Sequence, residues 1–146
     1  MTLNDKVRRF FDRNEITYQF LPSEDENELD SFEAGFKGHN GNFKLRVLTN
    51  EEDEWMLIIG FPAFSVPQKY MEQGIHAANL LNRTRLFVLC YVDPDDGEVA
   101  YRLGLMVPPG TPDETIERAI WTVCAATDND NASFMEAVFR DNGAMN

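Results

Sequence analysis

Residues 31–61, SFEAGFKGHNGNFKLRVLTNEEDEWMLIIGF, decide the fold because apolar and polar side chains alternate through three successive runs. A two-residue period is that of β-strands, so three strands are expected at about residues 31–37, 42–49 and 54–61. The connections between them, glycine-rich at 38–41 and polar at 50–53, suit tight turns. The sequence therefore predicts three consecutive antiparallel strands. Their apolar sets, each on one side of its strand, are Phe32, Ala34 and Phe36; Phe43, Leu45 and Val47; and Trp55, Leu57, Ile59 and Phe61.

Helical patterns lie on both sides of these strands. Apolar residues at helical spacing follow Thr2, which predicts a first helix capped by that residue. Ser65 and Gln68 form a capping-box pattern that predicts the start of a second helix, and Thr111 marks the start of a third. The run Asp-Asn-Asp-Asn at 128–131 is expected to break this last helix, because such side chains compete for backbone hydrogen bonds.

A second pair of strands is expected between the second and third helices. Residues 86–92 are almost wholly apolar, which predicts a strand covered on both faces, and the acidic glycine turn at 93–98 leads back into residues 99–107. A short β-prone run also occurs at 17–21. The predicted order is α-β-β-β-α-β-β-α, an α+β fold with an antiparallel sheet packed against helices, and residues 1–146 are expected to form a single domain.

The chain is strongly acidic, with 25 Asp and Glu residues against 13 Lys and Arg residues and a formal charge of −12. This charge repels phosphate groups, so neither nucleic acid nor a membrane is an expected partner. A basic protein segment, or a partner that approaches through an apolar patch, is more compatible. The acidic loop at 23–28 is either simply solvated or attracts such a basic partner. No signal-type N-terminus or membrane-length apolar run occurs, so a cytoplasmic location is expected.

Catalytic chemistry finds little support in the sequence. Cys90 and Cys124 lie inside apolar runs, which favours buried thiols over nucleophiles activated by His39 or His76. The turn at 93–98 lacks the spacing of a calcium-binding loop, and no phosphate loop, dinucleotide fingerprint or nucleophile elbow occurs. We therefore expect no catalytic residue, no metal site and no cofactor, and a protein that is not an enzyme.

Residues 66–107 support a family resemblance. Val66-Pro67 opens the second helix, Ala78-Asn79-Leu80-Leu81-Asn82 ends it, and the apolar run at 86–92 enters the turn Asp-Pro-Asp-Asp-Gly-Glu at 93–98. Together with the element order, these residues resemble the YbjN family of bacterial sensory transduction regulators, whose fold is similar to that of type III secretion chaperones. The resemblance implies a homodimer that binds protein, as an adaptor, regulator or chaperone-like module, and it supplies no catalytic residues.

The expected partner-binding surface is the apolar connection at 61–67, with Phe61, Phe64 and Val66 as its candidate residues. Its two prolines remove backbone donors and hold the chain extended. Phe64 could either pack under the second helix or stay open to a partner. The alternative function is a sensor of a small molecule or signal, with a pocket between the sheet and the helices.

Overall fold

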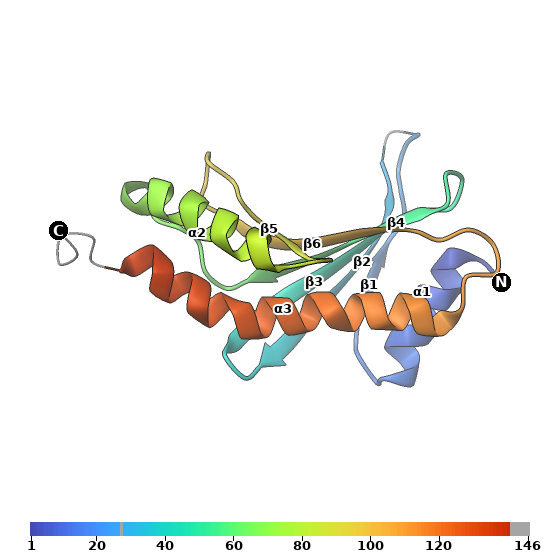
Figure 1. Cartoon of the computed structure of the whole chain (residues 1–146). Helices are drawn as coiled ribbons and strands as arrows, with labels where there is room; N and C mark the ends of the chain where they lie inside the picture. The colour runs from blue at the N-terminus through green and yellow to red at the C-terminus, as the bar shows by residue number, and fades with distance from the viewer. Residues whose placement is uncertain (27, 141–146) are drawn as a thin grey trace.

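The computed structural model describes residues 1–26 and 28–140. Asn27 of the acidic loop and the last six residues of the expected single domain lie outside the described part. The described chain forms an antiparallel sheet of six strands in the order β1-β2-β3-β4-β6-β5, so the predicted α+β class and antiparallel sheet are confirmed (Figure 1). The strands are β1 (Gln19–Leu21), β2 (Asp30–Gly38), β3 (Gly41–Asn50), β4 (Trp55–Pro62), β5 (Leu89–Val92) and β6 (Val99–Met106).

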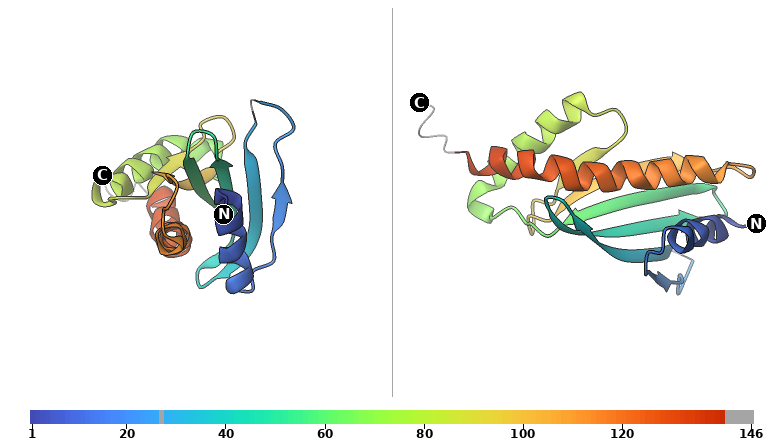
Figure 2. Two further views of the ribbon diagram at one scale, coloured as in Figure 1. Left: turned by 90° about the vertical axis from the view of Figure 1, so that its right-hand side faces the viewer. Right: turned by 90° about the horizontal axis from the view of Figure 1, so that it is seen from below.

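The helices all lie on one face of this sheet, here called the inner face (Figure 2). They are α1 (Leu3–Arg13), α2 (Met71–Thr84), which follows the short 3-10 helix η1 (Gln68–Tyr70), and α3 (Asp113–Phe139). Helix α1 covers the β2 end of the sheet, where Phe11 stacks on Phe32. Helix α3 crosses β3, β4 and β6, and α2 packs against β5 and α3. The opposite face, here called the open face, has no helix on it among the described residues.

The core lies between the inner face and the helices. Leu45, Val47, Met56 and Ile58 of the central strands are at most 1% exposed. Burial of such side chains stabilises the fold by about 1.5–3 kcal/mol each. The apolar set Trp55, Leu57, Ile59 and Phe61 does share one side of β4, but this is the side that points to the open face, where all four are half-buried.

The prediction of a doubly covered strand at 86–92 is wrong. Strand β5 begins only at Leu89 and lies at the edge of the sheet. Leu86 is 86% exposed and Phe87 is 69% exposed, whereas Val88 is buried. An apolar run therefore indicated burial where the fold instead leaves two large side chains at the surface.

The predicted capping box at Ser65 is also wrong. Ser65 forms an isolated bridge with Glu98, and the backbone N–H of Val66 donates to the carbonyl of Gly97 at 2.8 Å. These contacts keep the chain extended as far as Pro67, so the 3-10 turn begins at Gln68 and α2 at Met71.

The expected break at 128–131 does not occur, because α3 is continuous through these residues. Asp128 and Asp130 find tertiary partners in place of the local backbone. The Asp128 carboxylate accepts the backbone N–H groups of His39 and Asn40, each at 2.9 Å, and Asp130 pairs with Arg85. The N–H groups donated by Asn40 and His39 hold the pKa of Asp128 below its usual value. A carboxylate thus fastens the β2–β3 turn to the middle of α3.

Asn82 closes the free edge of β5. Its side-chain amide donates to the carbonyl of Cys90 at 3.0 Å and accepts the Cys90 N–H at 2.8 Å, as a neighbouring strand would do. An unpaired strand edge invites pairing with other chains, so this side chain both satisfies the backbone and blocks the edge.

We predict that Asn82→Ala lowers the free energy of unfolding by about 1–3 kcal/mol, because both backbone groups of Cys90 lose their protein partner. Urea denaturation measures this loss. Asn79→Ala is the matched control, since Asn79 lies on the same helix but is exposed, and it should change stability by less than about 0.5 kcal/mol. Equal effects of the two substitutions would contradict the assigned role of Asn82.

Candidate partner-binding surface

An apolar stripe follows β4 along the open face of the sheet. Trp55, Leu57, Ile59 and Phe61 point away from the helices at every second position, and each is half-buried by neighbouring strands. Leu48 of β3 extends the stripe beside Leu57, and Gly104 of β6 lies on its other side. A row of large apolar side chains on a sheet face without helices is typical of an interaction surface.

Basic side chains border this stripe on both sides. The sheet register places Ile59 directly between Arg46 of β3 and Arg102 of β6, and Phe61 next to Lys44 of β3. Arg46 pairs with Glu33 on β2, with 2.8 Å between the guanidinium nitrogen and the carboxylate oxygen, and lies 5.7 Å from the ring centre of Phe61. Within residues 1–26 and 28–140, neither Lys44 nor Arg102 forms an ion pair.

The stripe ends in a groove of about 690 Å³ between the β2–β3 hairpin and the connection that follows β4. Lys37 and Lys44 lie on the hairpin side, and Phe61 and Phe64 on the other. A smaller adjoining hollow of about 270 Å³ shares Gly35, Lys44 and Phe61 with it. A side chain at Gly35 would meet no atom within 4 Å, so the floor of the groove is open at this position.

An irregularity in the sheet shapes this groove. Gly60 pairs with Tyr101, and the next bridge joins Ser65 to Glu98, so the four residues 61–64 lie opposite only two residues of β6. The extra length makes the strand bulge and redirects its side chains. Strand β4 therefore separates from β6 after Gly60 while it stays paired with β3 through Pro62, and residues 61–65 line one side of the groove.

The three residues expected at the partner-binding surface differ in their surroundings. Phe61 lies on the open face and lines the groove. Phe64 is half-buried and packs edge-on against two rings of α3, with centroid distances of 6.2 Å to Phe134 and 5.6 Å to Phe139. Val66 is only 2% exposed and contacts α2 at Gly74, where a Cβ would lie 2.9 Å from the valine. Phe61 thus faces the groove, while Phe64 and Val66 pack against the helices.

Reactive groups are scarce in the part of the chain that the structure describes. Cys90 and Cys124 are free thiols, and burial raises the pKa of each to about 12. A thiol with such a pKa is almost entirely protonated at neutral pH and is a poor nucleophile. No cluster of His, Cys, Asp and Glu among the described residues could hold a metal ion, and no described helix has the length and apolar character needed to span a membrane.

We predict that a thiol reagent at pH 8 labels Cys90 and Cys124 slowly in the folded protein and rapidly after denaturation, because the reactive thiolate is disfavoured by burial. Reaction progress followed by absorbance measures both rates. Rapid labelling of either cysteine before unfolding would contradict the core assignment and reopen the question of a nucleophile.

Comparison with known proteins decides the family. Residues 4–135 match the family model YbjN, described as "Putative bacterial sensory transduction regulator". The chain belongs to the YbjN family. The predicted resemblance is therefore confirmed, and the regulatory description of the family is consistent with a role other than catalysis.

A solved structure shares the fold of this YbjN-family chain. It is described as "Crystal structure of YbjN, a putative transcription regulator from E. coli", and it aligns with a TM-score of 0.58 and 15% sequence identity over 97% of this chain and 93% of that chain. At this identity the likeness extends to the fold alone. No curated protein matches the sequence.

The sequence suggested Phe61 as a candidate residue but did not indicate the cations that lie beside it. Lys44, Arg46 and Arg102 alternate with inward-pointing residues on two strands, which is a signal that the sequence contains. The sequence alone does not show which side of β4 points to the helices, because the side chains on both of its faces are apolar. Without that orientation, the basic residues could not be assigned to one surface with Ile59 and Phe61.

Proposed function

We propose that this YbjN-family chain is a non-enzymatic regulator or adaptor, and that it binds a segment of another protein on the open face of its sheet. We also propose that the chain folds and acts as a single domain. The single observation that supports the binding role most is the half-buried stripe on β4, which no described helix covers and which ends in the groove beside Phe61. Large apolar side chains at the centre of a contact, with polar groups around them, supply most of the binding energy in protein interfaces. Its location is proposed to be the cytoplasm.

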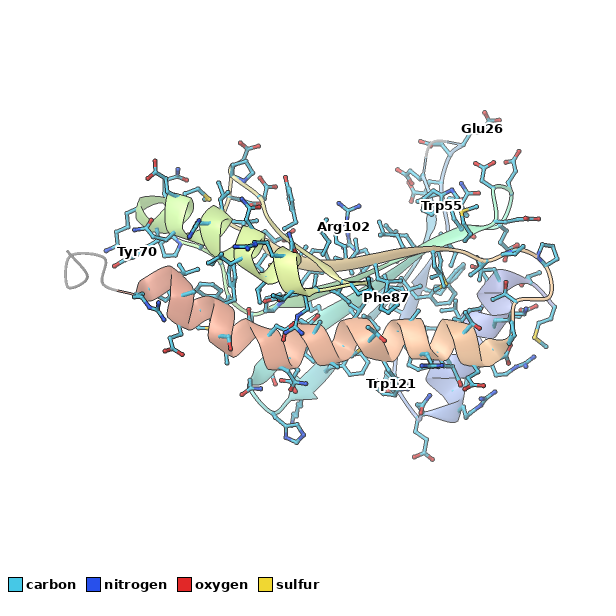
Figure 3. All side chains as sticks on the ribbon, viewed as in Figure 1. Glu26, Trp55, Tyr70, Phe87, Arg102 and Trp121 are labelled. Atoms are coloured by element: carbon cyan, nitrogen blue, oxygen red, sulfur yellow. The ribbon has the colours of Figure 1, made fainter. Side chains whose placement is uncertain are left out.

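We further propose that the chain works as a homodimer through the loop after α2. Arg85 is tied to Asp130 of α3 and Val88 is buried, so the two residues between them are held outward. Leu86 and Phe87 are the most exposed pair of neighbouring large apolar residues in the described chain, and Phe87 projects from the ribbon beside α3 (Figure 3). Such exposed apolar side chains are commonly covered by self-association.

A small-molecule sensor is the second candidate, and the groove supports it. Its volume of about 690 Å³ lies within the range of roughly 300–1,000 Å³ that is usual for ligand sites. The groove lies between the β2–β3 hairpin and residues 61–65, and its lining includes Phe36 and Phe43 as well as Lys44 and Phe61. A small ligand that raises the melting temperature in the absence of any protein partner would favour this function over the adaptor.

We predict that Phe61→Ala abolishes capture of partner proteins from native lysate and lowers the melting temperature by less than about 2 °C, because Phe61 contacts the partner more than the core. Affinity capture and thermal unfolding measure the two effects. Phe64→Ala is the matched control, and it should lower the melting temperature by about 4–8 °C through loss of its packing on α3. A Phe61→Ala protein that captures the same partners as the wild type would exclude this surface.

We predict that the protein at micromolar concentration has a mass near twice the 16.7 kDa of one chain, because dimer formation covers Leu86 and Phe87. Light scattering after size exclusion measures it. Phe87→Asp should give a monomer, since a carboxylate at the interface centre must be desolvated. Met106→Asp serves as the control, because Met106 is 68% exposed on a different part of the molecule. A monomeric wild type would refute the dimer.

A further inference from the structure

The open face reverses the charge balance of the chain. Acidic residues outnumber basic ones by 25 to 13 in the sequence, yet the strand residues on this face include four basic side chains and one acidic one. The basic side chains are Lys37, Lys44, Arg46 and Arg102, and the acidic one is Glu33. Many carboxylates of the chain lie instead in the turns at 51–54 and 93–98 and in the loop at 23–28.

The basic side chains lie directly beside the apolar stripe on the neighbouring strands. Neighbouring strands lie about 4.8 Å apart, so Arg46 and Arg102 lie one strand away on the two sides of Ile59. Glu33 neutralises Arg46, whereas Lys44 and Arg102 have no ion pair within the described residues. A ligand carboxylate could reach these two groups without breaking an existing ion pair.

From this arrangement we infer that the open face binds an acidic protein segment, with its aliphatic or aromatic side chains on the β4 stripe and its carboxylates on Lys44 and Arg102. The inference rests on the proposed function and names the chemistry of the partner. It also differs from the expectation of a basic partner, which the total charge of the chain suggested. The local field at a contact, and not the total charge, determines which side chains pair there, because water and salt screen charges beyond about 8 Å.

Larger anionic partners fit the surface less well. A nucleic acid or an anionic membrane would extend past the stripe to the acidic turns at 51–54 and 93–98, where it would meet repulsion. A short segment can remain on the stripe beside Lys44 and Arg102, and the acidic side chains near it are then Glu33, which is paired with Arg46, and Glu98, which lines the groove. The acidic loop of a second copy has suitable carboxylates at Glu24 and Glu26 but lacks large apolar side chains among them.

Selection from a display library of random peptides tests the inference, with peptides of roughly twelve residues, long enough to cross the sheet face. Selection on the wild-type chain should enrich peptides in which Asp and Glu alternate with Phe, Leu or Ile. The enriched peptide, synthesised with a fluorescent label, should bind about tenfold more weakly to the Lys44→Glu/Arg102→Glu variant, and binding should weaken as salt rises. Arg118→Glu, an exposed substitution on α3, should leave the affinity unchanged.

A version of the peptide with each Asp and Glu replaced by Asn and Gln separates the inference from the proposed function. Loss of binding by this neutral peptide supports the acidic partner. If the neutral peptide binds equally well, and Phe61→Ala still abolishes its binding, the inference is overturned while the proposed surface stands. If no enriched peptide depends on Phe61, both are overturned. A selected peptide that matches residues 22–29 would overturn the inference in favour of a second copy as the occupant.

Discussion

Helix α3 lies directly on β4 because Gly60 has no side chain at the crossing point. A Cβ on Gly60 would overlap the hydroxyl oxygen of Thr127, so any larger residue would force the helix away from the strand. The same hydroxyl donates to the carbonyl of Val123 at 2.7 Å, so the buried polar group at this contact is satisfied. From this crossing, Ile120, Val123 and Phe134 reach the inner face and become almost completely buried.

The position of α3 determines which side of the sheet is available to a partner. Helix α3 contacts α1 at one end and α2 at the other, so the three helices form one layer over the inner face (Figure 2). Asp128 fastens the β2–β3 turn to this layer, and Asn82 closes the edge of β5. The large surface of the sheet that the described helices leave uncovered is its open face. Its apolar stripe is therefore a consequence of the same packing that completes the core.

Much of this architecture could be predicted from the sequence, since the order of the long elements follows from hydrophobic period and turn residues. The YbjN resemblance was likewise evident from residues 66–107. The failures at Ser65 and at residues 128–131 share one physical cause, which is that tertiary contacts replace local preferences. Asp128 and Asp130 remain helical because His39, Asn40 and Arg85 satisfy their side chains. The failure at residues 86–92 has a different cause. An apolar run does not by itself show that the fold buries it, and Leu86 and Phe87 are exposed.

The candidate site was less predictable than the fold, because it depends on register across strands that are distant in sequence. Ile59 and Arg102 become neighbours only when β4 pairs with β6. The most direct test of the open face as a binding surface is nuclear magnetic resonance. The labelled chain is titrated with a peptide segment that binds it, and the chemical-shift changes are mapped onto the structure. The largest chemical-shift changes are predicted at Lys44, Leu57, Ile59, Phe61 and Arg102, with little change along the exposed side of α3. Changes confined to α1 and α3, with the β4 stripe unaffected, would contradict the open face as the binding surface.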